Sequence, residues 1–101
     1  MVLAPACPPL GEFRFTGHAR FEMARRSILE EEVTAVLRAP AQSEPQRLGR
    51  CVYQERTWDA AASKFYLLRV FVDMDRESPE VVSAYRTSKV EKYWRPHASH
   101  L

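Results

Sequence analysis

The chain has 101 residues, of which 46% are hydrophobic and 28% are charged, and its formal net charge is +2. This length fits one domain, the two Trp, four Tyr and five Phe argue against disorder, and no apolar run approaches the roughly 18 residues of a membrane span. The small positive charge alone is too weak to indicate a nucleic-acid partner.

The N-terminal residues predict a flexible leader. Residues 1–11 contain Pro5, Pro8 and Pro9 and no basic segment, so they do not resemble a signal peptide. Cys7 and Cys51 form no CxxC motif and no Cys/His cluster with metal-binding spacing. We therefore expect both thiols to be reduced, the location to be cytoplasmic, and neither a metal nor another cofactor to be bound.

The first half of the chain predicts two helices. Residues 12–16 alternate between apolar and polar, which fits either a short edge strand or an extended lead-in. A helix is expected at residues 18–26, capped by Thr16 or Gly17, because the apolar spacing changes to a helical period. Ser27 separates it from a second helix at residues 29–38, which begins with three glutamates and ends before Pro40.

The second half predicts a polar loop at residues 41–49 and then three strands, at residues 50–57, 64–73 and 80–88. Turns at residues 59–63 and 75–79 are short, so neighbouring strands should be antiparallel. Residues 90–101 should form a brief turn or strand and then fray. The predicted fold is α+β: two N-terminal helices on one face of a three- to four-stranded antiparallel meander, with a single domain at residues 12–95 and a flexible tail at residues 96–101.

Alternation along residues 64–73 assigns the two faces of this sheet. One row is apolar or aromatic throughout: Tyr66, Leu68, Val70 and Val72. The other row contains a charge: Phe65, Leu67, Arg69 and Phe71. Because an arginine normally points to water or to a ligand, we expect the Leu68 row under the helices and the Arg69 row on an open face. On the next strand, Val82 and Ala84 should face the helices, and the open face should receive Val81, Ser83, Tyr85 and Thr87.

Several short strings together resemble domain-of-unknown-function family 4258: HARFEMARRSI, EEV, VLRAP, VYQ, LLRV, VVSAYRTSK and KYW. Members of this family are small bacterial proteins that look related to the barnase, EndoU, colicin and RelE group of metal-independent RNases and toxins. The resemblance covers residues 18–94 and depends on the order and spacing of the strings. It implies a RelE-like sheet with an RNA-binding concave face. The chain departs from the family pattern at Ser27, where a glycine is usual, and at Leu29, where a polar cap is usual.

Metal-independent RNA cleavage needs a base, an acid and cations that stabilise the charged phosphorane. His18 stands at the position of the family's histidine, which implies an acid–base role, although a histidine there also suits the first turn of a helix. Arg69 could bind phosphate through its guanidinium or pair with an acid such as Glu55. Ser83 offers a hydroxyl on the same face, so the predicted catalytic residues are His18, Arg69 and Ser83.

A basic and aromatic cluster follows in the sequence. It contains the cations Arg86, Lys89, Lys92 and Arg95 and the rings Tyr85, Tyr93 and Trp94. Cations contact phosphates and rings stack on bases, whereas the same residues could form a solvated strand end with aromatics that close the core. The predicted substrate-binding residues are Tyr85, Arg86, Thr87, Lys89 and Lys92.

The function predicted from these residues is a toxin-like, metal-independent endoribonuclease or a close relative of one. One alternative is a non-catalytic RNA-binding module on the same fold. The other is a protein-interaction domain that binds a small antitoxin-like partner. The expected partners are therefore RNA or such a protein, with no membrane association, and the sequence does not determine the oligomeric state.

Overall fold

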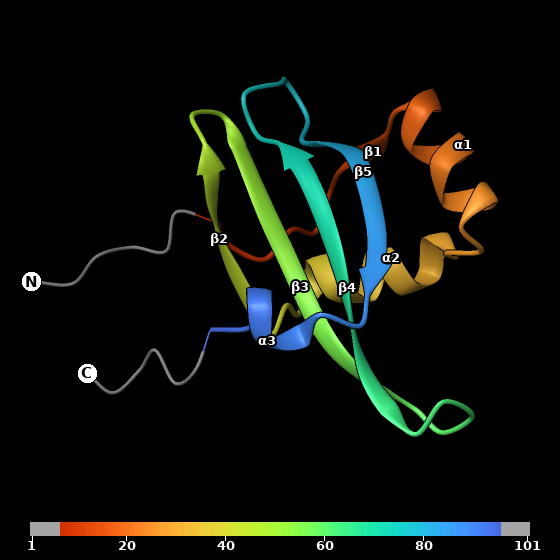
Figure 1. The fold of residues 1–101 in the computed structure, drawn as a ribbon. Coiled ribbons are helices and arrows are strands. Elements are labelled where there is room, and N and C mark those ends of the chain that lie inside the picture. Colours follow the sequence, from red (N-terminus) through yellow and green to blue (C-terminus); the bar gives the residue numbers. More distant parts are fainter. Residues whose placement is uncertain (1–6, 96–101) are drawn as a thin grey trace, which may run out of the picture.

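The computed structural model describes residues 7–95 and shows one mixed β-sheet with short helices packed against it (Figure 1). The elements in chain order are β1 (Arg14–Phe15), α1 (Gly17–Arg25), α2 (Glu30–Arg38), β2 (Gln42–Arg47), β3 (Arg50–Asp59), β4 (Lys64–Asp73), β5 (Glu80–Thr87) and α3 (Val90–Tyr93). The strands lie in the order β1-β5-β4-β3-β2. β1 runs parallel to β5, and the other neighbouring strands are antiparallel.

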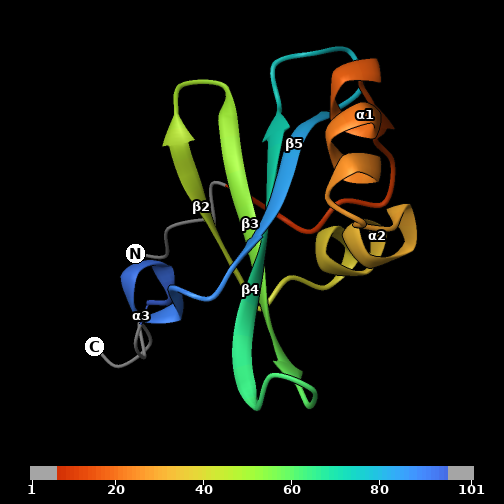
Figure 2. The ribbon, with the colours of Figure 1, turned by 45° about the vertical axis from the view of Figure 1, so that its right-hand side comes forward.

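The predicted fold is wrong in its sheet and in its helical layers, although the α+β class agrees with the structure. In place of a RelE-like antiparallel meander of three to four strands, the sheet has five strands and includes a parallel pair. In place of helices on one face only, α1 and α2 lie on one side of the sheet and α3 lies on the other (Figure 2). The bounds of β3, β4 and β5 differ from those predicted by at most two residues.

The sequence predicted too few strands because the two edge strands of the sheet carry weak sequence signals. β2 has the sequence QSEPQR, in which no apolar residues alternate. Its Pro45 cannot donate a ladder hydrogen bond, which an edge strand tolerates and a central strand does not. β1 has two residues, and Arg14 pairs with Glu80, 66 positions further along the chain. Both strands therefore depend on pairing partners that local sequence does not reveal.

The ends of the first two helices follow from identifiable residues. Thr16 caps α1, as one of the two predicted candidates, because its hydroxyl accepts a hydrogen bond from the Ala19 N–H at 3.0 Å. Ser27 follows α1 in a left-handed conformation with φ of 57°, which glycine adopts without steric cost. Before α2, the Leu29 N–H donates to the Glu32 carboxylate at 3.2 Å.

α1 and α2 cover one face of the sheet, which we call the helix side. Leu68, Val70 and Val72 of β4 belong to the core on this side, as predicted. Val81 also belongs to it, although the alternation predicts Val82, because the register of β4 and β5 shifts at a bulge between Phe71 and Val72. A shift of one residue moves a strand side chain to the opposite face. The helices contribute Ala19, Met23, Val33, Val36 and Leu37.

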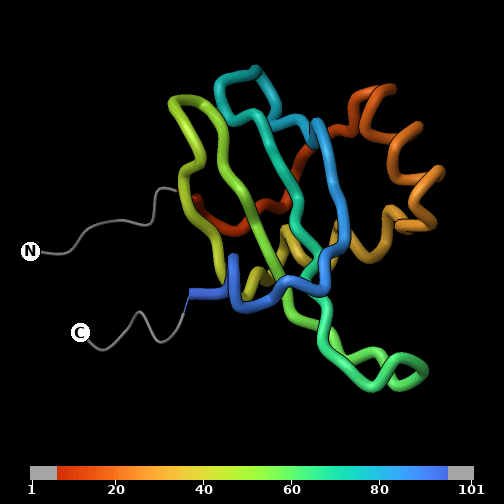
Figure 3. Tube along the Cα trace, viewed as in Figure 1, coloured from red at the N-terminus to blue at the C-terminus, as the bar shows by residue number. Residues whose placement is uncertain are grey.

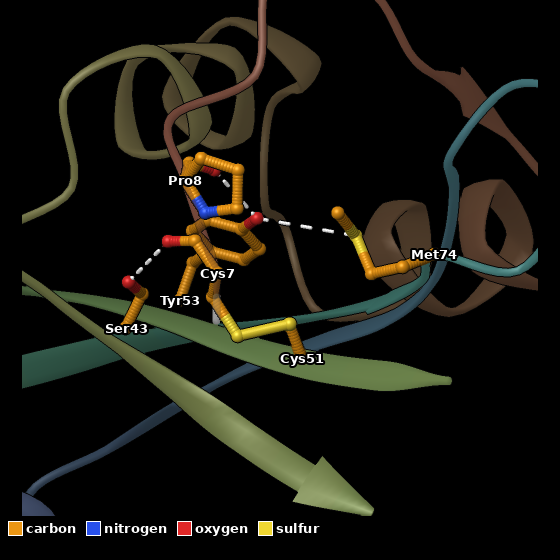
Figure 4. Close-up of a disulfide and its surroundings, with 6 residues drawn as sticks. All are labelled: Cys7, Pro8, Ser43, Cys51, Tyr53 and Met74. Atoms are coloured by element: carbon orange, nitrogen blue, oxygen red, sulfur yellow. Dashed lines mark hydrogen bonds between the residues drawn. A yellow bond between two sulfur atoms is a disulfide. The ribbon is translucent and has the colours of Figure 1, made fainter. Parts of the chain in front are cut away.

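The segment of residues 7–13 crosses the helix side behind β3 and β4 to reach β1 (Figure 3). Cys7 forms a disulfide with Cys51 of β3, so the prediction of reduced thiols is wrong. The Tyr53 hydroxyl donates to the Pro8 carbonyl at 2.8 Å beside this bond (Figure 4). Cys7 and Leu10 are 2% and 8% exposed, so the packed part of the chain begins inside the predicted leader. Residues 1–6 and the predicted tail at residues 96–101 lie outside the described residues.

α3 and the residues after it cover part of the opposite face, which we call the α3 side. The side chain of Gln54 donates to the Tyr93 carbonyl at 3.0 Å, and that of Gln42 donates to the Arg95 carbonyl at 2.6 Å. Arg95 in turn forms an ion pair with Glu44 of β2 at 2.7 Å. The hairpin of β3 and β4 extends past α2 and leaves its turn uncovered by any helix (Figures 1 and 2).

Candidate nucleic-acid interface

Arg69 is buried on the α3 side, with 9% of its surface exposed, so the prediction of an open-face arginine is wrong. Its Nε donates to Gln54 Oε1 at 3.0 Å, and its Nη1 donates to the Tyr85 hydroxyl at 2.8 Å. The guanidinium carbon lies 3.9 Å from the centre of the Tyr93 ring, which is a cation–π contact. The suggested partner Glu55 is paired in register with Leu68, on the other face. Arg69 thus fastens α3 to the sheet.

The predicted hydroxyl residues of β5 share the face of Arg69, as expected from alternation. Ser83 and Tyr85 are paired with Phe71 and Arg69 in the register of the sheet, and both are half-buried. The Tyr85 ring stacks on Phe71 with 5.8 Å between ring centres. The Tyr85 hydroxyl already accepts a hydrogen bond from Arg69. Tyr85 therefore has a structural role on this face.

The turn between β5 and α3 uses the remaining hydroxyl. Thr87 accepts a hydrogen bond from the Lys89 N–H at 3.0 Å, which shapes the backbone before α3. On α3 itself, hydrogen bonds with Tyr85 and then Lys92 lower the pKa of the Tyr93 phenol. Thr87 therefore positions Lys89 through the backbone, and its hydroxyl is already occupied as an acceptor.

His18 lies away from the other predicted catalytic residues. It is the second residue of α1 and is exposed. Its neighbour Ala19 packs into the core on the helix side, whereas Arg69 and Ser83 lie on the α3 side. The sheet therefore separates His18 from Arg69 and Ser83, and the structure does not assemble the three into one site.

Arg86 also lies on the helix side, because it is paired with Leu68 in the register of β4 and β5. Its Nη2 donates to the Glu32 carboxylate at 2.6 Å. Its Nη1 donates to the Arg26 and Ser27 carbonyls at 3.4 and 3.3 Å. Arg86 joins β5 to the junction of α1 and α2, so it does not belong with the other predicted substrate-binding cations.

Lys89 and Lys92 line an open cleft on the α3 side, with a volume of about 690 Å³. We call this cleft the basic groove. Its remaining lining residues come from the β3–β4 hairpin and from the region of α3: Arg56, Lys64, Phe65, Ser88, Val90 and Glu91. Four cations thus face a single carboxylate, that of Glu91, and none of the four forms an ion pair with a carboxylate of residues 7–95. Such a surface attracts polyanions.

Arg56 and Lys64 line the basic groove but were not predicted as binding residues from the sequence. Each stands close to an aromatic residue, Arg56 two positions before Trp58 and Lys64 directly before Phe65. This is the same interleaving of cations and rings that identified the C-terminal cluster, and it could have marked them. What sequence could not reveal is that α3 folds back beside the hairpin, which brings the two segments to one groove.

A larger cleft of about 830 Å³ lies on the helix side, between α2 and the hairpin. Its polar lining includes Glu32, Glu55 and Asp59, against the single cation Arg86. Arg86 is already paired with Glu32. Because these carboxylates would repel phosphate, the larger cleft is a poor nucleic-acid site.

Within residues 7–95, no group of three or more His, Cys, Asp or Glu side chains is placed to hold a metal ion. In the same part of the chain, no helix is long and apolar enough to cross a membrane. Comparison with models of protein families, with curated proteins and with solved structures finds no match to this chain. The resemblance to domain-of-unknown-function family 4258 therefore stays a prediction.

Proposed function

We propose that this chain is a non-catalytic RNA-binding module that holds the RNA backbone in the basic groove. The observation that carries the proposal is the convergence of Arg56 and Lys64 from the hairpin with Lys89 and Lys92 from the region of α3. Phosphate contacts by lysine and arginine supply most of the affinity of non-specific nucleic-acid binding, because they release condensed counterions.

A binding module fits this geometry better than the predicted endoribonuclease. General acid–base catalysis needs a proton-transfer group within hydrogen-bond reach of the reacting oxygen. His18 lies on α1, on the helix side, whereas the basic groove lies on the α3 side. The groove would hold the phosphate without that histidine beside it.

RNA is preferred over other polyanions because of the family resemblance, which points to a group of metal-independent RNases and toxins and implies an RNA-binding concave face. The alternative is an antitoxin-like protein partner. Absence of RNA binding in the groove would favour that alternative. The cytoplasmic location also stays a prediction. The Cys7–Cys51 disulfide weighs against it, because disulfides are rare in reducing compartments.

The test is the affinity of the protein for fluorescently labelled RNA, measured by anisotropy over a range of salt concentrations. We expect binding at low salt that weakens steeply as salt rises, and a double variant Lys89→Ala/Lys92→Ala whose salt slope is lower by about two units. The matched control is Arg38→Ala/Arg47→Ala, which removes two exposed cations that lie outside the groove and form no ion pair with a carboxylate of residues 7–95, and it should leave the affinity nearly unchanged.

Absence of RNA binding by the wild type at low salt would refute the proposal. Equal weakening by the two double variants would also refute it, because binding would then follow net charge and not the groove. Incubation of RNA with the protein in the presence of a chelator distinguishes an RNA-binding module from a metal-independent endoribonuclease. Intact RNA is expected, and cleavage would restore the endoribonuclease hypothesis.

A further inference from the structure

An exposed aromatic pair stands on the hairpin beside the basic groove. Trp58 and Phe65 are 52% and 43% exposed. They face each other across β3 and β4, with 5.0 Å between ring centres and 69° between ring planes. Large rings left in water beside a charged cleft are a common feature of binding sites. Phe65 itself lines the groove, and Trp58, in contact with it, lines the edge of the larger cleft.

Arg56 connects this pair to α3. Its guanidinium carbon lies 4.9 Å from the centre of the Phe65 ring and 4.8 Å from that of Trp94. Trp58, Phe65, Arg56 and Trp94 thus form a continuous series of planar groups, which we call the aromatic row. Because Arg56 and Phe65 line the groove as well, the row borders the surface that carries the lysines.

The aromatic row adds something that cations alone do not provide. Lysines attract every phosphate backbone, and the dense charge of a duplex favours it over a single strand on that basis alone. Exposed rings offer stacking, which is open to the unpaired bases of a single strand and closed to bases stacked inside a helix. A groove that combines both should therefore reverse the preference for duplex.

We infer that the basic groove binds single-stranded RNA, with bases stacked on Trp58 and Phe65 while Lys89 and Lys92 contact the phosphates. This inference rests on the proposed RNA-binding function and names its substrate class. Because stacking is tolerant of base identity, the groove takes unpaired RNA of varied sequence.

The experiment compares a labelled oligouridine with a labelled RNA hairpin that has the same number of phosphates and whose stem is closed by a non-nucleotide linker, so that it has no unpaired bases. The wild type should bind the oligouridine more tightly. Trp58→Ala and Phe65→Ala should each weaken oligouridine binding about 10- to 100-fold, the usual effect of losing one stacking ring, and should change hairpin binding by no more than about twofold. Thermal melting followed by circular dichroism checks that both variants remain folded, which is expected because the two substituted side chains are about half exposed.

Phe21→Ala is the matched control, because Phe21 is a 65% exposed ring on α1, on the helix side. It should leave both affinities unchanged. A second readout uses Trp58 and Trp94, the two tryptophans of the chain. In a Trp94→Phe variant, Trp58 is the remaining tryptophan, and oligouridine should quench its fluorescence if bases stack on it.

The outcomes separate this inference from the proposed function. Tighter binding of the hairpin, or ring variants that bind oligouridine like the wild type, would overturn the single-strand assignment while RNA binding itself stood. No binding of either RNA at low salt would overturn both. Loss of oligouridine binding in Phe21→Ala to the same degree as in Phe65→Ala would also overturn the assignment, because the effect would not depend on the groove.

Discussion

Arg69 is a buried cation that no carboxylate of residues 7–95 neutralises. Its charge is held by two neutral acceptors, on Gln54 and Tyr85, and by the face of the Tyr93 ring. Burying a charge without such contacts would cost several kcal/mol. The Arg69 side chain therefore holds α3 against the sheet, and this role depends on its contacts with all three neighbours.

Replacing Arg69 with alanine should lower the free energy of unfolding by about 2–4 kcal/mol, because the change leaves a cavity and leaves the buried Gln54 Oε1 atom without its donor. Chemical denaturation followed by tryptophan fluorescence measures this, with Trp94 reporting on the release of α3. Arg25→Ala, which removes an exposed arginine, should stay within about 0.5 kcal/mol of the wild type. If Arg69→Ala were as stable as that control, Arg69 would not hold α3 against the sheet.

At the scale of elements, the segment of residues 7–13 and α3 cover opposite faces of the sheet, and different kinds of contact hold them there. The segment of residues 7–13 is held covalently by Cys7–Cys51 and by hydrogen bonds to Tyr53 and Leu37. α3 has four residues, too few for a stable isolated helix. It is therefore held by tertiary contacts alone, and the lysines of the basic groove depend on those contacts for their placement.

The double variant Cys7→Ser/Cys51→Ser should lose about 2–4 kcal/mol of stability, because the disulfide closes a loop with a sequence separation of 44 and restricts the unfolded chain. Denaturation with and without a reductant measures the effect. The wild type should lose stability when reduced, and the variant should not respond. Two titratable thiols in the native, oxidised protein would contradict the disulfide directly.

At the scale of the whole molecule, the sheet divides the protein into a side that supplies stability and a side that carries the proposed function. The helix side holds the main apolar core, the disulfide and His18. The α3 side holds the basic groove, which Arg56 and Phe65 of the aromatic row line. Substitutions of exposed residues on the helix side should therefore leave RNA binding intact.

His18→Ala tests this division. His18 is exposed and lies across the sheet from Arg69, so the variant should bind RNA with the affinity of the wild type. It should also show no loss of any RNA-cleaving activity that the wild type displays. A fall of roughly 10²–10⁴-fold in cleavage rate, in a variant that melts like the wild type, would instead show a positioned proton-transfer group and contradict the separation of the two sides.

Sequence by itself determined the elements whose signals are local. The helical spacing of apolar residues predicted α1 and α2, strand segments bounded by short turns predicted β3, β4 and β5, and Thr16 and Ser27 marked helix ends through cap and turn chemistry. Alternation along residues 64–73 placed the Leu68 row correctly under the helices. These features need only neighbours within a few positions of the chain.

Only the tertiary structure decided the features that join distant segments. The parallel pairing of β1 with β5, the disulfide and the bulge that turns Val81 inward all depend on partners far along the chain. The burial of Arg69 depends on α3 folding back over β4, which no local period encodes. The basic groove exists for the same reason: its lysines and its hairpin cations are separated in sequence, and long-range packing alone brings them together.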